Sequence, residues 1–270
     1  MMINDPSPEV VFLKLGGSLL TDKTAVEALR VDVLRRLAAE IKEAFERHGD
    51  LKLVLGHGSG SFGHVAAARF DTRSGVRTTE EWLGYVKVSD AAARLNREVC
   101  GALLAAGLPA ISLQPSASAH CRDGRINHLA VEPVQAALKA GVLPVLYGDV
   151  AFDAVRGGTI ISTEEIMSFL AVRLKPTRLL LAGETEGVLD EQGRSIPELN
   201  QRNLALLSAA LGGSRGTDVT GGMASKVRDM LDLVQTIDGL TVRIFSGLSP
   251  GNVRKALLGD TRELGTLIRG

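Results

Sequence analysis

Glycines and lysines occur together in several short segments of this sequence. The first segment, Lys14-Leu15-Gly16-Gly17-Ser18, follows an apolar run, and Lys23 lies nine residues after Lys14. Two glycines let the backbone approach a ligand closely, so that its amides can bind phosphate oxygens. Neighbouring lysines can then offset the charge of a phosphoryl group. Taken alone, the segment is equally compatible with an ordinary turn that carries two surface lysines.

The second segment, His57-Gly58-Ser59-Gly60-Ser61-Phe62-Gly63-His64, lies between an expected strand and an expected helix. Its glycines are typical of a loop that binds an anion. It is not a Walker A loop, because no Lys-Ser or Lys-Thr pair closes it. It also lacks the acidic residue that ends the following strand in a dinucleotide site. His64 could donate a hydrogen bond to a phosphate or carry a proton, or it could be structural.

Two further segments join glycine to a charged side chain. Gly148-Asp149 ends an apolar run, and Gly221-Gly222 lies at the expected start of a helix in Thr217–Lys226. Glycines at that position cost roughly 1 kcal/mol each relative to good helix formers, which indicates close approach to a ligand. A helix N-terminus followed by Lys226 suits the β- and γ-phosphates of a nucleotide. The alternative is an ordinary helix capped by Thr220.

The elements that must position these segments alternate between strands and helices. Strands are expected at residues 10–15, 51–55, 109–113, 142–147, 178–182 and 241–245. Helices are expected at 26–48, 79–106 and 227–234, and hairpins at 151–162 and 188–196. This order predicts an α/β fold with a largely parallel sheet and helices on both faces. Ligands of such sheets bind at the carboxyl ends of the strands, where the glycine segments fall.

Composition excludes several classes of protein. The chain has 270 residues, enough for one large domain or two lobes, and its 31 basic residues balance its 31 acidic residues. That balance argues against a nucleic-acid-binding protein. No apolar run reaches the ~20 residues of a membrane span, and no signal peptide is visible, so we expect a cytoplasmic protein. Cys100 and Cys121 are too few for a disulfide framework or a cysteine-ligated zinc site.

Together, the four segments resemble those of the amino acid kinase superfamily in type and in order. The resemblance runs from about residue 10 to the end of the chain and includes Gly265-Thr266-Leu267-Ile268. It implies an αβα sandwich over residues 9–270, after a disordered stretch at 1–8. Residues 9–175 would form an acceptor-binding lobe and residues 176–270 an ATP-binding lobe. Within the superfamily, Gly60-Ser61-Phe62-Gly63-His64 is similar to the isopentenyl phosphate kinases, and the fosfomycin kinases share much of it.

The resemblance implies ATP-dependent, in-line phosphorylation of isopentenyl phosphate to isopentenyl diphosphate, with Mg²⁺ and in a homodimer. Two alternatives stay open. One is another member of the superfamily, such as a fosfomycin kinase, that acts on a phosphonate, carbamate or acyl acceptor. The other is a non-catalytic nucleotide-binding protein, but the presence of Lys14, Lys23 and Lys226 argues against it, because a pure binder does not need all three.

Carried over position by position, the resemblance assigns the site residues to three groups. The catalytic residues are Lys14, Lys23, His64 and Lys226. The ATP-binding residues are Lys14, Leu15, Gly16, Gly17, Ser18, Ser59, Glu184, Gly222 and Lys226. The residues that bind the acceptor are Gly58, Gly63, His64, Gly148 and Asp149, and no side chain is assigned as a metal ligand. Lys23 would stabilise the transition state, and His64 would contact the acceptor phosphate rather than act as a base.

This sequence departs from the superfamily pattern in two places. Ser162-Thr163-Glu164-Glu165 stands where Ser-Gly-Asp often precedes an acidic residue, and Glu184-Thr185-Glu186-Gly187 stands where Asp-Val-Asp-Gly is common. Both changes keep a carboxylate but lengthen it, which affects the contacts to the nucleotide. The organic tail of the acceptor is expected against Trp82, Leu83, Tyr85, Val86 and Ala93, although these residues could equally belong to the core.

Overall fold

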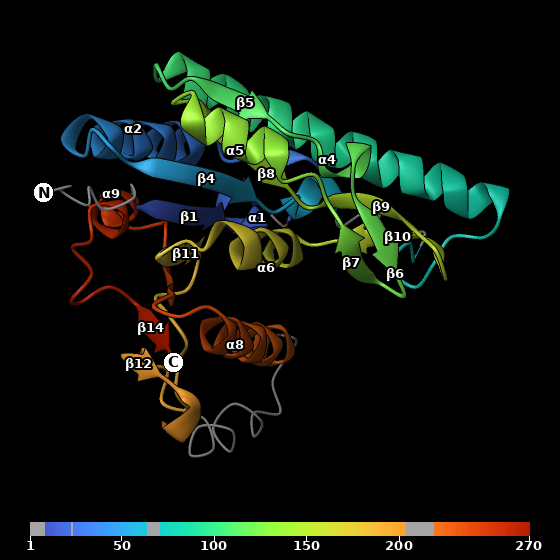
Figure 1. Ribbon diagram of the computed structural model, residues 1–270. Coiled ribbons are helices and arrows are strands. Elements are labelled where there is room, and N and C mark those ends of the chain that lie inside the picture. Colours follow the sequence, from blue (N-terminus) through green and yellow to red (C-terminus); the bar gives the residue numbers. More distant parts are fainter. Residues whose placement is uncertain (1–8, 23, 64–70, 204–218) are drawn as a thin grey trace, which may run out of the picture.

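The computed structural model describes residues 9–22, 24–63, 71–203 and 219–270 (Figure 1). Within them the central sheet has the strand order β12-β14-β13-β11-β1-β4-β8-β5. These strands are β12 (Glu198–Leu199), β14 (Thr266–Arg269), β13 (Thr241–Ser246), β11 (Arg178–Gly183), β1 (Val10–Leu15), β4 (Lys52–His57), β8 (Leu143–Tyr147) and β5 (Ala110–Ser112). Neighbouring strands are parallel except β13 and β14, so the predicted α/β fold with a largely parallel sheet is confirmed.

Helices cover both faces of this sheet. Alternate residues of a strand point to opposite faces. Accordingly, Val11 and Leu13 pack with α2 (Val31–Arg47), α4 (Thr79–Ala105) and α9 (Asn252–Leu257). Phe12 packs on the other face with α5 (Glu132–Lys139), α6 (Thr163–Leu174) and α8 (Val219–Thr236). Figure 1 shows α2 and α4 on one side of β1 and β4, and α6 and α8 on the other. The expected αβα sandwich is therefore confirmed.

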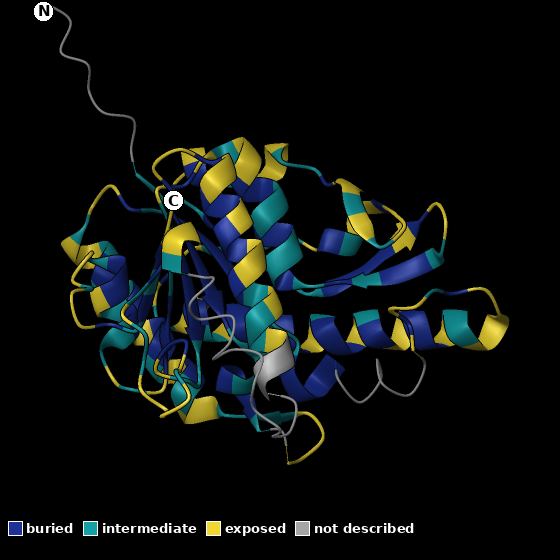
Figure 2. Ribbon diagram, turned by 90° about the horizontal axis from the view of Figure 1, so that it is seen from below, coloured by how far each residue is buried: buried dark blue, intermediate teal, exposed yellow. Residues whose placement is uncertain are grey.

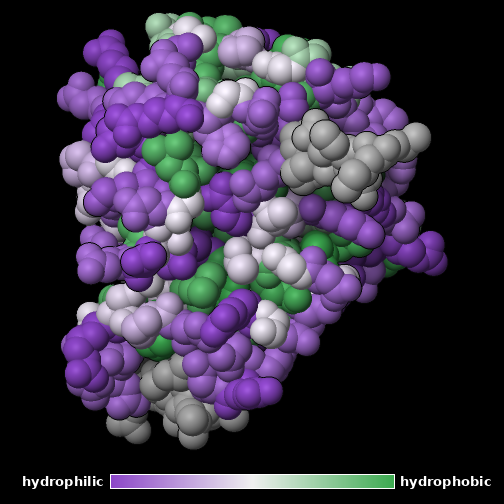
Figure 3. Space-filling model, turned by 60° about the vertical axis from the view of Figure 1, so that its left-hand side comes forward, coloured by the Kyte–Doolittle hydropathy of each residue, from purple (hydrophilic) through white to green (hydrophobic). Residues whose placement is uncertain are grey.

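Burial follows this layering. The strands between the helices consist mainly of buried residues, and exposed residues lie on the outer sides of the helices (Figure 2). The face seen in Figure 3 is mostly hydrophilic, with hydrophobic atoms in separate patches between polar side chains. No helix in the part of the chain that the structure describes is long and apolar enough to cross a membrane.

The hairpins were predicted only in part. The hairpin expected at 151–162 is confirmed as β9 (Asp149–Asp153) and β10 (Gly157–Ile161). The one expected at 188–196 forms only the isolated pair Leu189–Ser195. The sequence reasoning missed β6 (His120–Arg122) with β7 (Arg125–His128), which extends β9 and β10 into a second sheet.

A further short hairpin shifts the start of the first long helix. Strand β2 (Thr21–Asp22) follows the short helix α1 (Gly17–Leu20) and pairs with β3 (Ala28–Leu29). The helix expected from residue 26 therefore begins only at Val31. The cause is that residues 28–29 make ladder hydrogen bonds with β2, which helical residues cannot do. In this hairpin, residues 21–22 pair with residues 28–29.

Candidate active site

Lys14 lies on the face of β1 that is covered by α6. It shares this face with Phe12, because side chains two residues apart on a strand point the same way. Its side chain is mostly buried, and its ammonium group donates a hydrogen bond to Glu164, the second residue of α6. Burial lowers the pKa of Lys14, and the negative charge of Glu164 opposes that effect. The first glycine segment therefore begins with a lysine that is anchored by a carboxylate.

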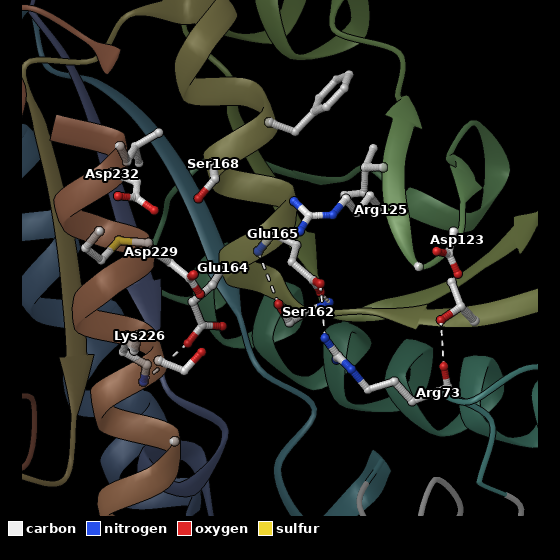
Figure 4. Close-up of a pocket in the computed structure, with 18 of the residues that line it drawn as sticks. Arg73, Asp123, Arg125, Ser162, Glu164, Glu165, Ser168, Lys226, Asp229 and Asp232 are labelled. Carbon is white, nitrogen blue, oxygen red and sulfur yellow. Dashed lines mark hydrogen bonds and ion pairs between the residues drawn. The ribbon is translucent and has the colours of Figure 1, made fainter. Parts of the chain in front are cut away.

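Glu164 also pairs with the second lysine predicted to be catalytic. The Nζ of Lys226 on α8 lies 3.3 Å from the same Oε1 that accepts from Lys14. Figure 4 shows Glu164 and Lys226 pointing toward each other between α6 and α8. Burial disfavours a charged Glu164, but the two ammonium groups outweigh it and lower its pKa to about 2. We call Lys14, Glu164 and Lys226 the donor corner.

The start of α6 fixes the place of Glu164. Ser162 caps this helix: its hydroxyl accepts from the amide of Glu165, whose side chain accepts from the amide of Ser162. Such a capping box satisfies amides that have no partner within the helix. The next residue, Thr163, donates its hydroxyl to the carbonyl of His57 at 2.6 Å. That hydrogen bond ties the donor corner to the end of β4, where the second glycine segment begins.

The two glycine segments touch each other through their backbones. A Cβ on Gly17 would lie 2.3 Å from the amide nitrogen of Gly60, and one on Gly58 would lie 2.8 Å from that of Gly17. Real Cβ atoms do not come so close to backbone, so both positions need glycine. The amide of Gly58 donates to the carbonyl of Leu15 at 3.0 Å. We call residues 16–18, where α1 begins, the donor loop, and residues 58–63, of which 60–63 are helical, the acceptor loop, after the roles that the sequence predicts for them.

His57 lies below the acceptor loop and is fully buried. Its Nε2 lies 3.0 Å from Nδ2 of Asn96 on α4, and its ring stacks on that of Tyr147. Burial lowers the pKa of His57 to about 4, so its ring is neutral at neutral pH. Nε2 then accepts from Asn96, since an amide nitrogen only donates. His57 therefore supports the loop from inside and does not reach a ligand.

Gly148 and Asp149 already have partners inside the protein. The amide of Gly148 donates to the carbonyl of His57 at 3.2 Å. The carboxylate of Asp149 is buried and accepts from the Ser89 hydroxyl and from the amides of Ser116 and Val150. Burial raises the pKa of Asp149, and these hydrogen bonds oppose the rise. Both residues lie at the carboxyl end of β8, where they can border a ligand by shape.

The other residues predicted to bind ATP lie around the same strand ends. Glu184 directly follows β11, and its carboxylate pairs with Arg30 at 3.1 Å. Gly222 lies in the first turn of α8, and a Cβ there would meet no atom of the described residues within 4 Å, so none of these atoms requires this glycine. Leu15 is buried in the core, so only its backbone faces the loops. Ser18 lies in α1, and Ser59 and Gly63 lie in the acceptor loop.

Two predicted catalytic residues, Lys23 and His64, lie outside the described residues, as do residues 1–8. The predicted apolar wall is present in part. Trp82 and Tyr85 pack with Val76, Val88 and Val150 in a small cluster of their own. Leu83 and Val86 lie outside this cluster, and both are more than half exposed on α4.

A large cavity lies beside the donor corner rather than over the glycine loops. It has a volume of about 1020 Å³ and lies between α6, α8 and the β6–β7 hairpin (Figure 4). Glu164, Lys226 and Gly222 lie at its border, but no residue of the two glycine loops lines it. Its lining carries charges of both signs: the acidic side chains include Asp229 and Asp232, and the basic ones include Arg125 and Lys226.

Comparison with known proteins supplies the family. The model of the amino acid kinase family matches residues 9–246. This chain belongs to the amino acid kinase family. Members of the family are phosphotransferases, so the chain is a kinase, and the predicted αβα fold agrees with that of the family.

Similar proteins point to one branch of the amino acid kinase family. Isopentenyl phosphate kinase from Methanothermobacter thermautotrophicus is 36% identical, over 97% of this chain and 99% of that protein. The enzyme of the same name from Haloferax volcanii is 38% identical, over 90% of this chain and 98% of its own. A solved isopentenyl phosphate kinase structure superimposes with a TM-score of 0.80 at 32% identity, covering 96% of this chain and 99% of its own.

Sequence reasoning missed the bridging role of Glu164 and did not single out Thr21. Glu164 was noted only as a departure from the superfamily pattern. The capping box of Ser162 and Glu165 is a readable signal for a helix start and could have placed Glu164 in the first turn of α6. No local signal shows that this turn meets β1, because the two residues of the ion pair are 150 positions apart.

Proposed function

We propose that this chain phosphorylates isopentenyl phosphate with ATP to give isopentenyl diphosphate and ADP. The observation that carries the proposal is the donor corner: Lys14 and Lys226, from opposite ends of the chain, share one carboxylate oxygen of Glu164 beside two glycine loops. The near full-length similarity to isopentenyl phosphate kinases favours this acceptor over the other acceptors of the family. A fosfomycin kinase or a non-catalytic nucleotide-binding protein is not favoured.

The chemistry explains why positive charge is the main requirement. A phosphate monoester is already a nucleophile near neutral pH, so its oxygen needs no strong base. The main obstacle is repulsion between two polyanions. Lys14, Lys226 and the backbone amides of the loops lower that repulsion and hold the two reactants in line. Glu164 keeps both ammonium groups in place while leaving the corner with a net positive charge.

Each part of the site then has a role. ATP is contacted by the residues of the first group, with support from the backbone of Leu15. This group consists of Lys14, Gly16, Gly17, Ser18, Ser59, Glu184, Gly222 and Lys226. Gly58, Gly63, His64, Gly148 and Asp149 border the acceptor, and Lys23 stabilises the transition state. Residues 9–175 form the acceptor lobe and residues 176–270 the ATP lobe. Val150, the residue after Asp149, belongs to the small cluster of Val76, Tyr85 and Val88, and the apolar tail of the acceptor lies against this cluster.

Magnesium enters the site as the complex with ATP. Among residues 9–22, 24–63, 71–203 and 219–270, no three His, Cys, Asp or Glu side chains lie close enough together to hold a metal ion. Glu164, the carboxylate nearest the reaction, is already bound by two lysines. Mg²⁺ binds readily through substrate phosphates and water, so this donor set fits a metal held by the nucleotide. We also propose a cytoplasmic homodimer.

A panel of acceptors tests the proposal directly. The purified chain is incubated with ATP, Mg²⁺ and, in turn, isopentenyl phosphate, other alkyl monophosphates, fosfomycin, carbamate and acyl amino acids. We expect ADP release with isopentenyl phosphate, and a new diphosphate resonance in the ³¹P NMR spectrum. ADP release only with fosfomycin or an amino acid would refute the proposed acceptor. Absence of ADP release with every acceptor would refute the proposed kinase reaction.

A further inference from the structure

Thr21 lies between the two glycine loops without facing solvent. It is the first residue of β2, directly after α1, and none of its surface is exposed. Its hydroxyl donates to the carbonyl of Gly17 at 2.9 Å and accepts from the amide of Ser61 at 2.8 Å. One side chain therefore joins the donor loop to the acceptor loop by two hydrogen bonds of good length.

The acceptor loop packs against this hydroxyl so closely that only glycine fits at position 60. A Cβ on Gly60 would lie 2.1 Å from Oγ1 of Thr21 and 2.6 Å from the carbonyl oxygen of Gly17. Gly60 also has a φ of +51°, a conformation that side chains rarely adopt. The spacing of the two loops is thus set by direct contact.

The hydroxyl has no hydrogen left to donate to a substrate phosphate. A threonine hydroxyl has one hydrogen to donate, and Thr21 gives it to Gly17. Its oxygen is buried among loop atoms and accepts from Ser61. Thr21 can therefore act on the reaction only through the loops that it joins.

We propose that Thr21 is a positioning residue that fixes the donor loop relative to the acceptor loop, so that the two bound phosphates meet in line. The inference rests on the proposed function, because it assigns one reactant to each loop. Each loop keeps its own amides and glycines without the hydroxyl. Loss of the hydroxyl therefore leaves the binding of each substrate intact and disturbs their relative placement. Misplacement of reacting groups by about 1 Å costs roughly 100-fold in rate.

The decisive variants differ only in the hydroxyl. Thr21→Val replaces it with a methyl group of similar size, whereas Thr21→Ser keeps it. We expect Thr21→Val to lower kcat on the order of 10- to 100-fold, while the KM for ATP and the KM for the acceptor each change less than about threefold. Thr21→Ser should keep kcat within about threefold of the wild type. Calorimetric Kd values for each substrate alone should be unchanged in both.

Thr159→Val is the matched control. Thr159 is as buried as Thr21, and its hydroxyl donates to the carbonyl of Arg73, so the substitution also removes one buried hydrogen bond. It contacts neither glycine loop, and its kcat should stay near that of the wild type. If Thr21→Val does not fold, as judged by its thermal unfolding, comparison of Thr21→Ala with Thr21→Ser gives the same contrast.

The outcomes separate this inference from the proposed function. A wild-type chain that releases ADP only with another acceptor refutes the proposed acceptor, and the same kcat comparison is then made with that acceptor. Wild-type kcat in a folded Thr21→Val chain overturns the inference while leaving the function intact. So does a loss expressed in KM alone, or an equal loss in Thr21→Ser. A wild-type chain that releases no ADP with any acceptor overturns both.

Discussion

The donor corner and the acceptor loop are neighbours, yet they are made of different kinds of group. In the donor corner, three charged side chains from β1, α6 and α8 meet, and Glu164 pairs with both lysines. The acceptor loop, residues 58–63, contains no charged side chain and consists of glycine, serine and phenylalanine. Its shape comes from backbone contacts with the donor loop and from the hydroxyl of Thr21.

The difference separates two tasks that phosphoryl transfer requires. In the proposed function, charge is supplied by lysines whose positions depend on one carboxylate, and geometry is supplied by loop glycines that admit no larger residue. The corner should therefore be sensitive to loss of charge, and the loop to loss of space. The division would be wrong if removing a charge from the corner had no effect, or if adding a side chain to the loop had none.

The largest effect is expected from Lys14→Met, which removes one of the two cations but keeps an unbranched side chain. Loss of a single group that stabilises developing charge typically lowers kcat by about 10²- to 10³-fold. Lys139→Met, at an exposed position on α5, is the matched control. Steady-state kinetics give the comparison. A Lys14→Met enzyme whose kcat equals that of the control would contradict the role of the corner.

Two glycine substitutions compare a crowded position in the acceptor loop with an open position on α8. Gly60→Ala must place a Cβ against Oγ1 of Thr21 at a positive φ, whereas the Cβ of Gly222→Ala meets no atom in the part of the chain that the structure describes. Strain and overpacking together predict a free energy of unfolding lower by roughly 2–4 kcal/mol for Gly60→Ala. Gly222→Ala should be neutral or more stable by up to about 1 kcal/mol, because alanine favours helix. Urea unfolding measures both, and equal losses would be inconsistent with the described loop contact.

A smaller effect is the acid sensitivity of the corner. The folded protein holds the pKa of Glu164 at about 2, below its ordinary 4.5, so its charged form stabilises the fold above pH 4.5. That contribution is lost as the pH falls toward 2. Glu164→Gln lacks it, so the difference in free energy of unfolding between the wild type and the variant should narrow across this window. A difference that stays constant with pH would show that the ion pairs do not stabilise the fold.

A pH effect of similar size, in a higher pH range, is expected from His57 below the acceptor loop. The pKa of His57 is lowered from 6.5 to about 4, because burial disfavours its charged form. The unfolded chain therefore takes up a proton first, and stability falls as the pH drops from 6.5 to about 4. His57→Gln should flatten the stability profile in this window, whereas His128→Gln, at an exposed position, should not. If the wild type, His57→Gln and His128→Gln gave parallel profiles of stability against pH, His57 would not contribute to the loss of stability in acid.

The sequence predicts the strands well because each is a compact apolar run with a turn at its end. The runs at 10–15, 178–182 and 241–245 coincide with β1, β11 and β13 to within a residue. Lys14 and Lys226 could be identified for a similar reason, since glycines at a strand end or helix start are costly without a ligand. In the folded chain these two lysines meet at Glu164, as a shared phosphate site requires.

What could not be predicted depends on contacts between distant residues. The β1–α6 ion pair and the Thr21–Ser61 hydrogen bond follow from the order of strands in the sheet, which no local pattern reveals. The β6–β7 hairpin is different, because its turn carries a readable signal. Asp123 and Gly124 both have positive φ, as expected for an Asp-Gly hairpin turn. The short strands beside it were too polar to be recognised.

The central claim is that corner and loops hold two phosphates for direct transfer, without a covalent enzyme intermediate. The stereochemical course at phosphorus tests it most directly. ATP made chiral at the γ-phosphorus with oxygen isotopes is reacted with isopentenyl phosphate, and the configuration of the transferred group is determined in the diphosphate product. A single in-line displacement predicts inversion. Retention would mean that a side chain such as Glu164 takes the phosphoryl group first, and it would contradict the account.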